Sequence, residues 1–231
     1  MCNISTAKKS ILQQNIESYS PKEKPVILRI AEEVSNKTKH TYSINFNENE
    51  PDSFETNRLL IRHFRDSDCK DLQQIAISKE FSEFADFDHE WPADEKSIKS
   101  ITEYFAAKKQ FWAVEVKNLS SVVCMVNFNG MNAEKQMDIG NVMNGEYFDN
   151  DYEYEALGVL YDYCFKYLNP EEIIAHWVVA DKKKIEPLKK LGMTMLNTGL
   201  TDAFKANAKG EKRQTEGCKM IITRKEWEAY R

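Results

Sequence analysis

The sequence has 231 residues, of which 42% are hydrophobic and 30% are charged, and its formal net charge is -5. A chain of this length and composition can form one domain with a sizeable core and an additional segment. The acidic balance provides no basic excess to neutralise phosphates, so we expect no nucleic-acid partner. No apolar run is long enough for a signal peptide or a membrane span, which predicts a cytoplasmic protein without membrane attachment.

The cysteines are scattered along the chain with no close pair: Cys2, Cys69, Cys124, Cys164 and Cys218. Metal ligation would need Cys or His residues at short spacing, so we predict no metal site. An odd number of cysteines without a secretory signal argues for reduced thiols. Cys124 and Cys164 lie within apolar runs, where we expect them to be buried as small hydrophobic residues.

The first fifty residues have a different pattern from the remainder. Apolar residues recur at helical spacing over 11–19 and again over 27–34. The polar stretch 45–52 contains a proline and is typical of a linker. We therefore predict an N-terminal helical extension over 1–50 and a main domain over 51–231. Because short helices are marginal in isolation, we expect the extension to pack on the main domain or to form homodimer contacts.

From residue 55 onward, predicted strands and helices are mixed. Apolar runs predict strands at 58–64, 111–116, 121–128, 137–143, 173–179, 193–196 and 217–223. Helical spacing predicts a helix that begins with Asp66 as its N-cap, one through Ile98 and Phe105, one from Leu157 to Tyr167, and one that ends at Gly192. The strands on either side of the 157–167 helix should form a right-handed parallel crossover. We therefore expect an α+β (α/β) fold with a mixed, mostly antiparallel sheet and helices on both faces.

Several segments of the main domain match the motifs of one family, in order and at similar spacing. They include 55–62 (ETNRLLIR), 111–117 (FWAVEVK), 139–140 (IG), 189–193 (KKLGM) and 223–227 (TRKEW). Together they resemble the GNAT superfamily of N-acetyltransferases, in the branch that includes the ribosomal-protein N-terminal acetyltransferases. The resemblance covers the main domain and implies transfer of an acyl group from acetyl-CoA to an amine.

The resemblance also implies where acetyl-CoA would bind. In the family two neighbouring strands part, the pantetheine arm lies between them, and the pyrophosphate meets backbone N–H groups at the start of the long helix. A helix N-terminus supplies free N–H donors, and glycines let the backbone approach closely. The implied cofactor-binding residues are Gly140, Asn141, Val142 and Met143 on the strand, Asp149, Asn150, Asp151, Tyr152, Glu153 and Tyr154 in the turn, and Asp181 and Lys184 at the next helix.

The turn before the long helix departs from the family pattern. Asp151 replaces a glycine and Glu153 replaces a small residue of the motif. In one interpretation these carboxylates simply stabilise the helix start, by about 0.3–1 kcal/mol each. In the other they occupy the anion site and repel a pyrophosphate, by roughly 4 kcal/mol for charges about 4 Å apart. The basic run 182–184 could reach round and offset this charge.

Acetyl transfer to an amine needs a base that accepts the proton of the nitrogen. Asp138 stands where relatives often carry a glutamate with this role, so the resemblance implies that it is the base. A solvated carboxylate at a strand end is the alternative. Glu115 is a second candidate base, with an outward-facing polar residue as its alternative. His63 and His176 lie in predicted strands, and we expect both to be hydrogen-bonded structural histidines.

The segment 81–91 mixes aromatic and acidic residues. In the family this loop shapes the acceptor site, and aromatic faces beside acids suit a cationic amine. Phe84, Phe87 and Trp91 are therefore candidate substrate-binding residues, with plugging of the core as the alternative. Two hypotheses remain for the whole chain. It is an acyl-CoA-dependent N-acetyltransferase acting on a small amine or a peptide N-terminus, or a catalytically inactive GNAT-like protein that binds a partner or another ligand.

Overall fold

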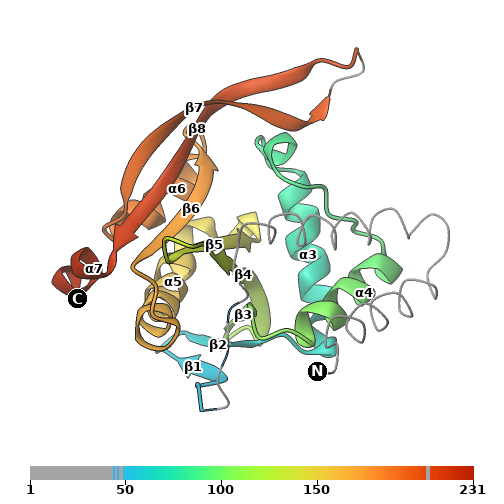
Figure 1. Cartoon of the computed structure of the whole chain (residues 1–231). Helices are drawn as coiled ribbons and strands as arrows, with labels where there is room; N and C mark the ends of the chain where they lie inside the picture. The colour runs from blue at the N-terminus through green and yellow to red at the C-terminus, as the bar shows by residue number, and fades with distance from the viewer. Residues whose placement is uncertain (1–43, 45, 47–48, 207–208) are drawn as a thin grey trace, which may run out of the picture. The chain divides into compact units, whose positions relative to one another are not determined.

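The structure is a computed structural model that describes residues 44, 46, 49–206 and 209–231. The helices expected at 11–19 and 27–34 lie outside the described residues, so the N-terminal extension stays a prediction. Within the described part, one eight-stranded sheet has the strand order β1-β2-β3-β4-β5-β6-β8-β7. Figure 1 shows this sheet with helices on either side of it.

The strands are β1 (Ser53–Glu55), β2 (Leu59–His63), β3 (Phe111–Val116), β4 (Ser121–Met131), β5 (Gln136–Met143), β6 (Glu172–Val178), β7 (Thr194–Ala206) and β8 (Lys212–Thr223). All neighbouring pairs are antiparallel except β5 and β6, which are parallel. The parallel pair is connected through a helix, as a parallel connection requires. This arrangement confirms the predicted mixed, mostly antiparallel sheet.

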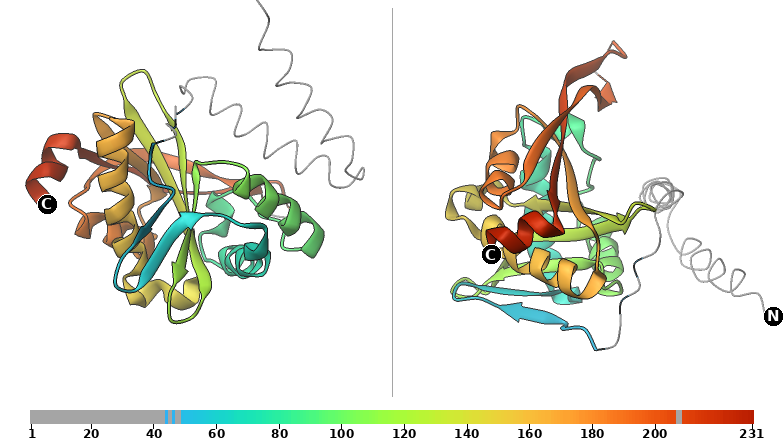
Figure 2. Two further views of the ribbon diagram at one scale, coloured as in Figure 1. Left: turned by 90° about the horizontal axis from the view of Figure 1, so that it is seen from below. Right: turned by 60° about the vertical axis from the view of Figure 1, so that its left-hand side comes forward.

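The helices are α3 (Cys69–Glu80), α4 (Glu95–Ala106), α5 (Tyr152–Tyr163), α6 (Lys182–Lys190) and α7 (Arg224–Tyr230), with single turns η1 (Asp66–Asp68), η2 (Ala85–Phe87) and η3 (Gly145–Asn150). A π-helical turn, η4 (Cys164–Leu168), extends α5 and ends at Asn169, which has a positive φ of 55°. Helices α3 and α4 lie on one face of the sheet, and α5 lies on the other (Figure 2).

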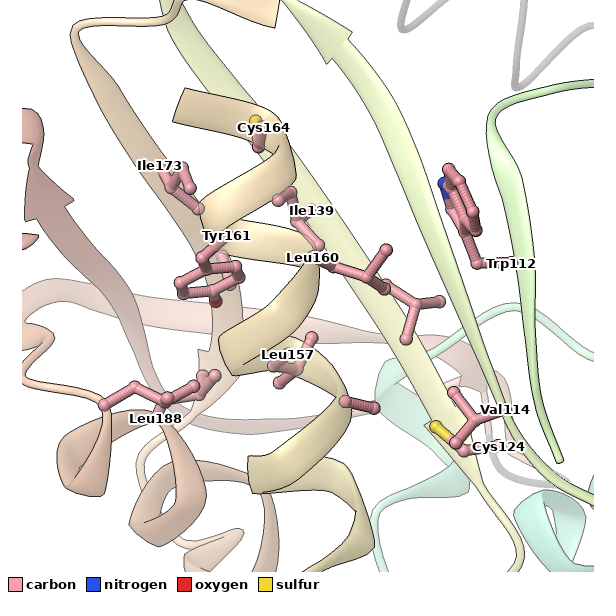
Figure 3. Packing of buried hydrophobic residues seen from close by; sticks show 14 of the residues in the cluster. Trp112, Val114, Cys124, Ile139, Leu157, Leu160, Tyr161, Cys164, Ile173 and Leu188 are labelled. Atoms are coloured by element: carbon pink, nitrogen blue, oxygen red, sulfur yellow. The ribbon is translucent and has the colours of Figure 1, made fainter. Parts of the chain in front are cut away.

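The largest core lies between the sheet and α5. Leu157, Leu160 and Tyr161 of α5 and Cys164 of η4 face residues from several strands, as Figure 3 shows. All four are fully buried, and burial of such apolar side chains stabilises a fold by about 1.5–3 kcal/mol each. Cys124 is also fully buried, which confirms the expectation for both thiols, and burial raises the pKa of each.

One local prediction was wrong, and two strands were predicted too short. Asp66 does not cap α3, because residues 66–68 form a separate turn and α3 begins at Cys69. The last two strands are much longer than the predicted 193–196 and 217–223, and they form a hairpin of 13 and 12 residues. Most side chains of β7 are exposed, so its sequence lacks the apolar pattern from which a strand is recognised.

Candidate functional site

Strands β5 and β6 pair only at their beginnings. Their register ends at Asp138 and Ile174, although β5 continues to Met143 and β6 to Val178. Burial alternates along β5, so that Met137, Ile139, Asn141 and Met143 are buried while Asp138, Gly140 and Val142 are half-buried. The apolar members of the buried set belong to the core that contains α5. The half-buried set therefore lies on the opposite face, against which α3 packs.

The start of α5 follows directly from the end of β5 through the turn η3. Asp151 precedes the helix with φ 56° and ψ 18°, which is the left-handed region where glycine is favoured and aspartate is tolerated. The backbone here therefore has a conformation that a glycine adopts at no steric cost. The first turn of the helix presents N–H groups that have no partner within the helix and that carry the positive end of its dipole.

Each of three carboxylates at this helix start is paired with a cation from another element. The pairs are Asp151 with Lys190 at 2.6 Å, Glu155 with Arg58 at 2.6 Å, and Glu153 with Lys184 at 3.5 Å. Three positive charges thus balance the three negative ones. Of the basic run 182–184, Lys184 does reach the acidic turn. The remaining acids of the turn, Glu146 and Asp149, are exposed.

A buried polar cluster joins β5, α5 and α6. Its members are Asn141, Glu153 and Lys184, which are 4%, 3% and 7% exposed. The amide nitrogen of Asn141 donates to Oε1 of Glu153, and Nζ of Lys184 lies 3.5 Å from the same oxygen. Nζ also lies 5.3 Å from the ring centroids of Phe148 and Trp177. No acceptor among the described residues forms a hydrogen bond with it.

Asp181 caps α6, and its Oδ1 accepts a hydrogen bond from the backbone N–H of Lys184 at 3.3 Å. This cap fixes the start of α6 and so places Lys184 toward the cluster. Burial raises the pKa of Asp181 above its ordinary value, although the ammonium of Lys184 lowers it. The negative charge of Glu83 also raises the pKa of Asp181. The 81–91 loop, to which Glu83 belongs, therefore lies close enough to this cap to affect its charge.

The candidate base Asp138 lies at the point where β5 and β6 part. Two asparagines of β4 lie beside Gly140, two residues further along β5: a Cβ atom at Gly140 would lie 2.9 Å from Oδ1 of Asn127 and 3.3 Å from Nδ2 of Asn129. The sheet is therefore polar here, and a larger residue at position 140 would require the side chain of Asn127 to shift. Neither asparagine was selected from the sequence, although two asparagines in an otherwise apolar strand were a usable signal.

The two strand histidines differ. Nδ1 of His63 lies 3.3 Å from the carbonyl oxygen of Phe111, its ring packs 4.2 Å from that of Trp112, and burial lowers its pKa. This confirms its structural role. His176 was misjudged, because it is exposed and has no hydrogen bond among the described residues. It lies two residues after Ile174, so the alternation of β6 puts it on the same face as Asp138.

The second candidate base, Glu115, is engaged by a buried arginine. Nε and Nη2 of Arg62 lie 2.9 and 2.8 Å from its Oε2. The same guanidinium donates to both carboxylate oxygens of Asp68, at 2.7 and 2.9 Å. A carboxylate held in this way supports β2, β3 and the turn before α3, which favours Asp138 over Glu115 as the base.

The far end of the β7–β8 hairpin contacts the loop between α3 and α4 (Figure 1). Lys205 forms an ion pair with Glu80 at 2.7 Å, and the ring of Phe204 lies 4.3 Å from that of His89. The guanidinium of Arg213 lies 4.7 Å from the ring centroid of Phe87, and its Nη2 donates to the carbonyl oxygen of Glu83 at 2.8 Å. We call these contacts the clasp.

The three candidate acceptor-binding aromatic residues thus have different surroundings. Phe87 lies under Arg213, and Trp91 lies 5.7 Å from Nζ of Lys79 and contacts the ring of Phe105. Phe84 is half-buried, with no ring contact among the described residues. Cations of the chain itself therefore occupy two of the three aromatic faces.

No helix within the described ranges is long and apolar enough to cross a membrane.

The comparisons with known proteins agree with this architecture. A model of the acetyltransferase (GNAT) domain matches residues 58–194. The chain therefore belongs to the GNAT acetyltransferase family. No curated protein matches the sequence.

Solved structures with the same fold include three of particular interest. A GNAT-family acetyltransferase from Bacillus anthracis has 21% identity and a TM-score of 0.60, with 74% of this chain and 98% of that chain covered. The ribosomal-protein-S5-alanine acetyltransferase from Vibrio fischeri has 16% identity and a TM-score of 0.60, with 76% and 98% covered. Mycobacterium smegmatis RimJ in complex with CoA-disulfide has 16% identity and a TM-score of 0.55, with 73% and 83% covered. At these identities the likeness concerns the fold.

Proposed function

We propose that this chain is an acyl-CoA-dependent N-acetyltransferase that acetylates a primary amine. The observation that carries the proposal is the parting of β5 and β6 after Asp138 and Ile174, beside the N-terminus of α5. Parted strands can admit a narrow arm between them, and a helix N-terminus can bind phosphate oxygens at the end of that arm. The similar fold of a protein solved with CoA-disulfide supports acetyl-CoA as the donor.

The residues at the site fit this donor. The N–H groups of Tyr152, Glu153 and Tyr154 would receive the diphosphate. The buried ammonium of Lys184 has no hydrogen-bond acceptor in the part of the chain that the structure describes. Because Asp151 and Glu155 are each paired with a cation, they add little net negative charge. Bound acetyl-CoA would supply a thioester: its acetyl group would pass to the acceptor nitrogen as the C–S bond breaks, and CoA would leave as the free thiol.

Asp138 would accept the proton that the amine gives up. A protonated amine has no free electron pair, so the base must lie on the side from which the acceptor arrives. Asp138 is half-buried on the face of the sheet opposite α5, where the polar side chains of Asn127 and Asn129 also lie. The backbone of residues 140–143 continues from it and would align the thioester.

The acceptor would be cationic before it reacts. The 80–90 segment carries five acids: Glu80, Glu83, Asp86, Asp88 and Glu90. Within the described residues, three cations contact this segment: Lys79, Lys205 and Arg213. The surplus of acids favours an ammonium group at this end of the site. Small amines and peptide N-termini both fit, and the fold of a ribosomal-protein-S5-alanine acetyltransferase supports including the latter. Such an enzyme would act in the cytoplasm.

One observation favours a second candidate function. Glu153 is buried in the region where the family has a small residue, and its carboxylate bridges toward β5. If this cluster never opens, the chain is a GNAT-like protein without catalytic activity that binds a partner or another ligand. The fold alone does not decide between the two, because one fold supports different functions.

Two measurements on the same sample separate the candidates. Calorimetry reports acetyl-CoA binding, and release of free thiol reports transfer to a panel of primary amines and peptide N-termini. We expect micromolar binding and turnover, with turnover lost in Asp138→Asn and kept in the control Glu134→Gln, an exposed acid near the start of β5. Binding without turnover for any acceptor would support the second candidate. Absence of binding would remove the enzyme proposal.

A further inference from the structure

The ammonium of Lys184 is an unusual buried group. Its side chain is 9% exposed, and Nζ has three N–H donors but no hydrogen bond among the described residues. Burying such donors without acceptors is unfavourable. Its neighbours are the rings of Phe148 and Trp177 and, at 3.5 Å, the carboxylate of Glu153. The site therefore offers a positive charge and hydrogen-bond donors that no group within the described ranges fully uses.

Glu153 satisfies this charge only in part. It is the second residue of α5, so its own side chain carries the negative charge that a helix N-terminus favours. Its Oε1 accepts from Asn141, which lies on β5 beyond the last residue paired with β6. A carboxylate and a phosphate share negative charge and acceptor oxygens, so Glu153 occupies the position that a phosphate oxygen would take.

Glu153 and a bound phosphate cannot both keep this position. Two negative charges repel strongly where water is excluded. Within the described residues, Lys184 is the one cation that contacts the cluster, so it can balance only one of them. A second cation is close at the surface: Nζ of exposed Lys183 lies 5.2 Å from the ring of Phe148, the same ring that Lys184 contacts. A Glu153 side chain that leaves the cluster would move toward this lysine.

We propose that Glu153 is a built-in occupant of the anion site, and that the ligand's phosphate displaces it and takes over its ion pair with Lys184. This inference rests on the proposed function, because it concerns the same site. It makes the resting chain closed and limits binding to ligands whose negative charge exceeds that of one carboxylate, such as a diphosphate. Removal of the internal competitor then strengthens binding, whereas removal of Lys184 weakens it.

Two ligands test the proposal: CoA, and inorganic pyrophosphate as a probe of the anion site alone. Calorimetry and the ligand-induced rise in melting temperature are measured for the natural chain, Glu153→Gln, Lys184→Met and the double variant. Gln keeps an oxygen that can accept from Asn141, and Glu153→Ala serves as a second variant if Gln disturbs folding. Glu146→Gln removes an exposed acid of the same turn and is the matched control.

We expect Glu153→Gln to bind both ligands at least about tenfold more tightly than the natural chain, which corresponds to about 1.4 kcal/mol. Lys184→Met should bind both at least about tenfold more weakly, and the double variant should lose the gain of Glu153→Gln because the two residues act through one ion pair. Glu146→Gln should stay within about twofold.

The possible failures are distinguishable. If the natural chain binds pyrophosphate and CoA as tightly as Glu153→Gln does, the internal-occupant proposal is wrong while the proposed function stands. If Glu153→Gln gains affinity for pyrophosphate but neither protein binds CoA, the anion site is as proposed and the acyl-CoA function is wrong. If neither ligand binds to any variant, both proposals are overturned.

Discussion

Replacement of Arg62 by methionine should destabilise the fold strongly. The side chain is 6% exposed and holds Asp68 through two hydrogen bonds and Glu115 through contacts of 2.8 and 2.9 Å. Burial alone would lower the pKa of the guanidinium, but the two carboxylates raise it, so the charge is held in place. Methionine preserves much of the volume and leaves two carboxylates, one of them 4% exposed, without their cation.

Removing one partner of a buried ion pair costs about 3–5 kcal/mol, because the remaining charge is uncompensated. We therefore expect the free energy of unfolding to fall by about this amount at pH 7, which shifts the urea midpoint by roughly 1–2 M. Lys70→Met removes an exposed lysine near the start of α3 and should cost less than about 0.5 kcal/mol. A loss below about 1 kcal/mol for Arg62→Met, or one equal to the control, would refute the reasoning.

Three further predictions concern catalysis, the clasp and a buried tyrosine. Asp138→Asn should lower kcat about 10²–10⁴-fold with a smaller change in KM, since the base acts on the reaction step. Burial would raise the pKa of Glu80, but Lys205 and other donors lower it below the ordinary value of 4.5. The stabilising effect of the Glu80 carboxylate is therefore present above pH 4.5 and is lost as the pH falls further. Protection of the β7 amides, measured as exchange relative to the intrinsic rate at each pH, should fall in acid for the natural chain and fall less in Glu80→Gln. Burial, and then a hydrogen bond to Glu50, raise the pKa of Tyr163 above the ordinary value of 10.0, so the unfolded chain loses this proton first. The free energy of unfolding should therefore fall above about pH 10, and less steeply in Tyr163→Phe. This variant should also lose about 1.5–3 kcal/mol of stability at pH 7, because it lacks the hydrogen bond to Glu50.

Much of the fold follows from local patterns. The strands at 111–116 and 121–128 were recognised because their apolar residues are consecutive and buried on both faces, and the structure has β3 at the same bounds and β4 from the same first residue. Gly192 was recognised as a helix stop, and it has φ 84° just after α6. These features depend on residues that are close in sequence, so periodicity and turn chemistry were sufficient.

The candidate site was harder to predict because its contacts join distant segments. The acids before α5 were visible in the sequence, but their partners are far away: Arg58 lies 97 positions from Glu155, and Lys190 lies 39 positions from Asp151. Charge counting alone therefore gave a net repulsion that the pairing in the folded chain largely removes. His176 was misjudged for a related reason, since the burial of a strand side chain depends on which distant elements pack on its face of the sheet.

The most direct measurement is a crystal structure of the chain grown with CoA. We predict that the diphosphate lies against the backbone N–H groups of residues 152–154, that the pantetheine arm runs between β5 and β6, and that Nζ of Lys184 contacts a phosphate oxygen while Glu153 points to solvent. A structure with CoA bound elsewhere, and with Glu153 still bonded to Asn141, would contradict the account.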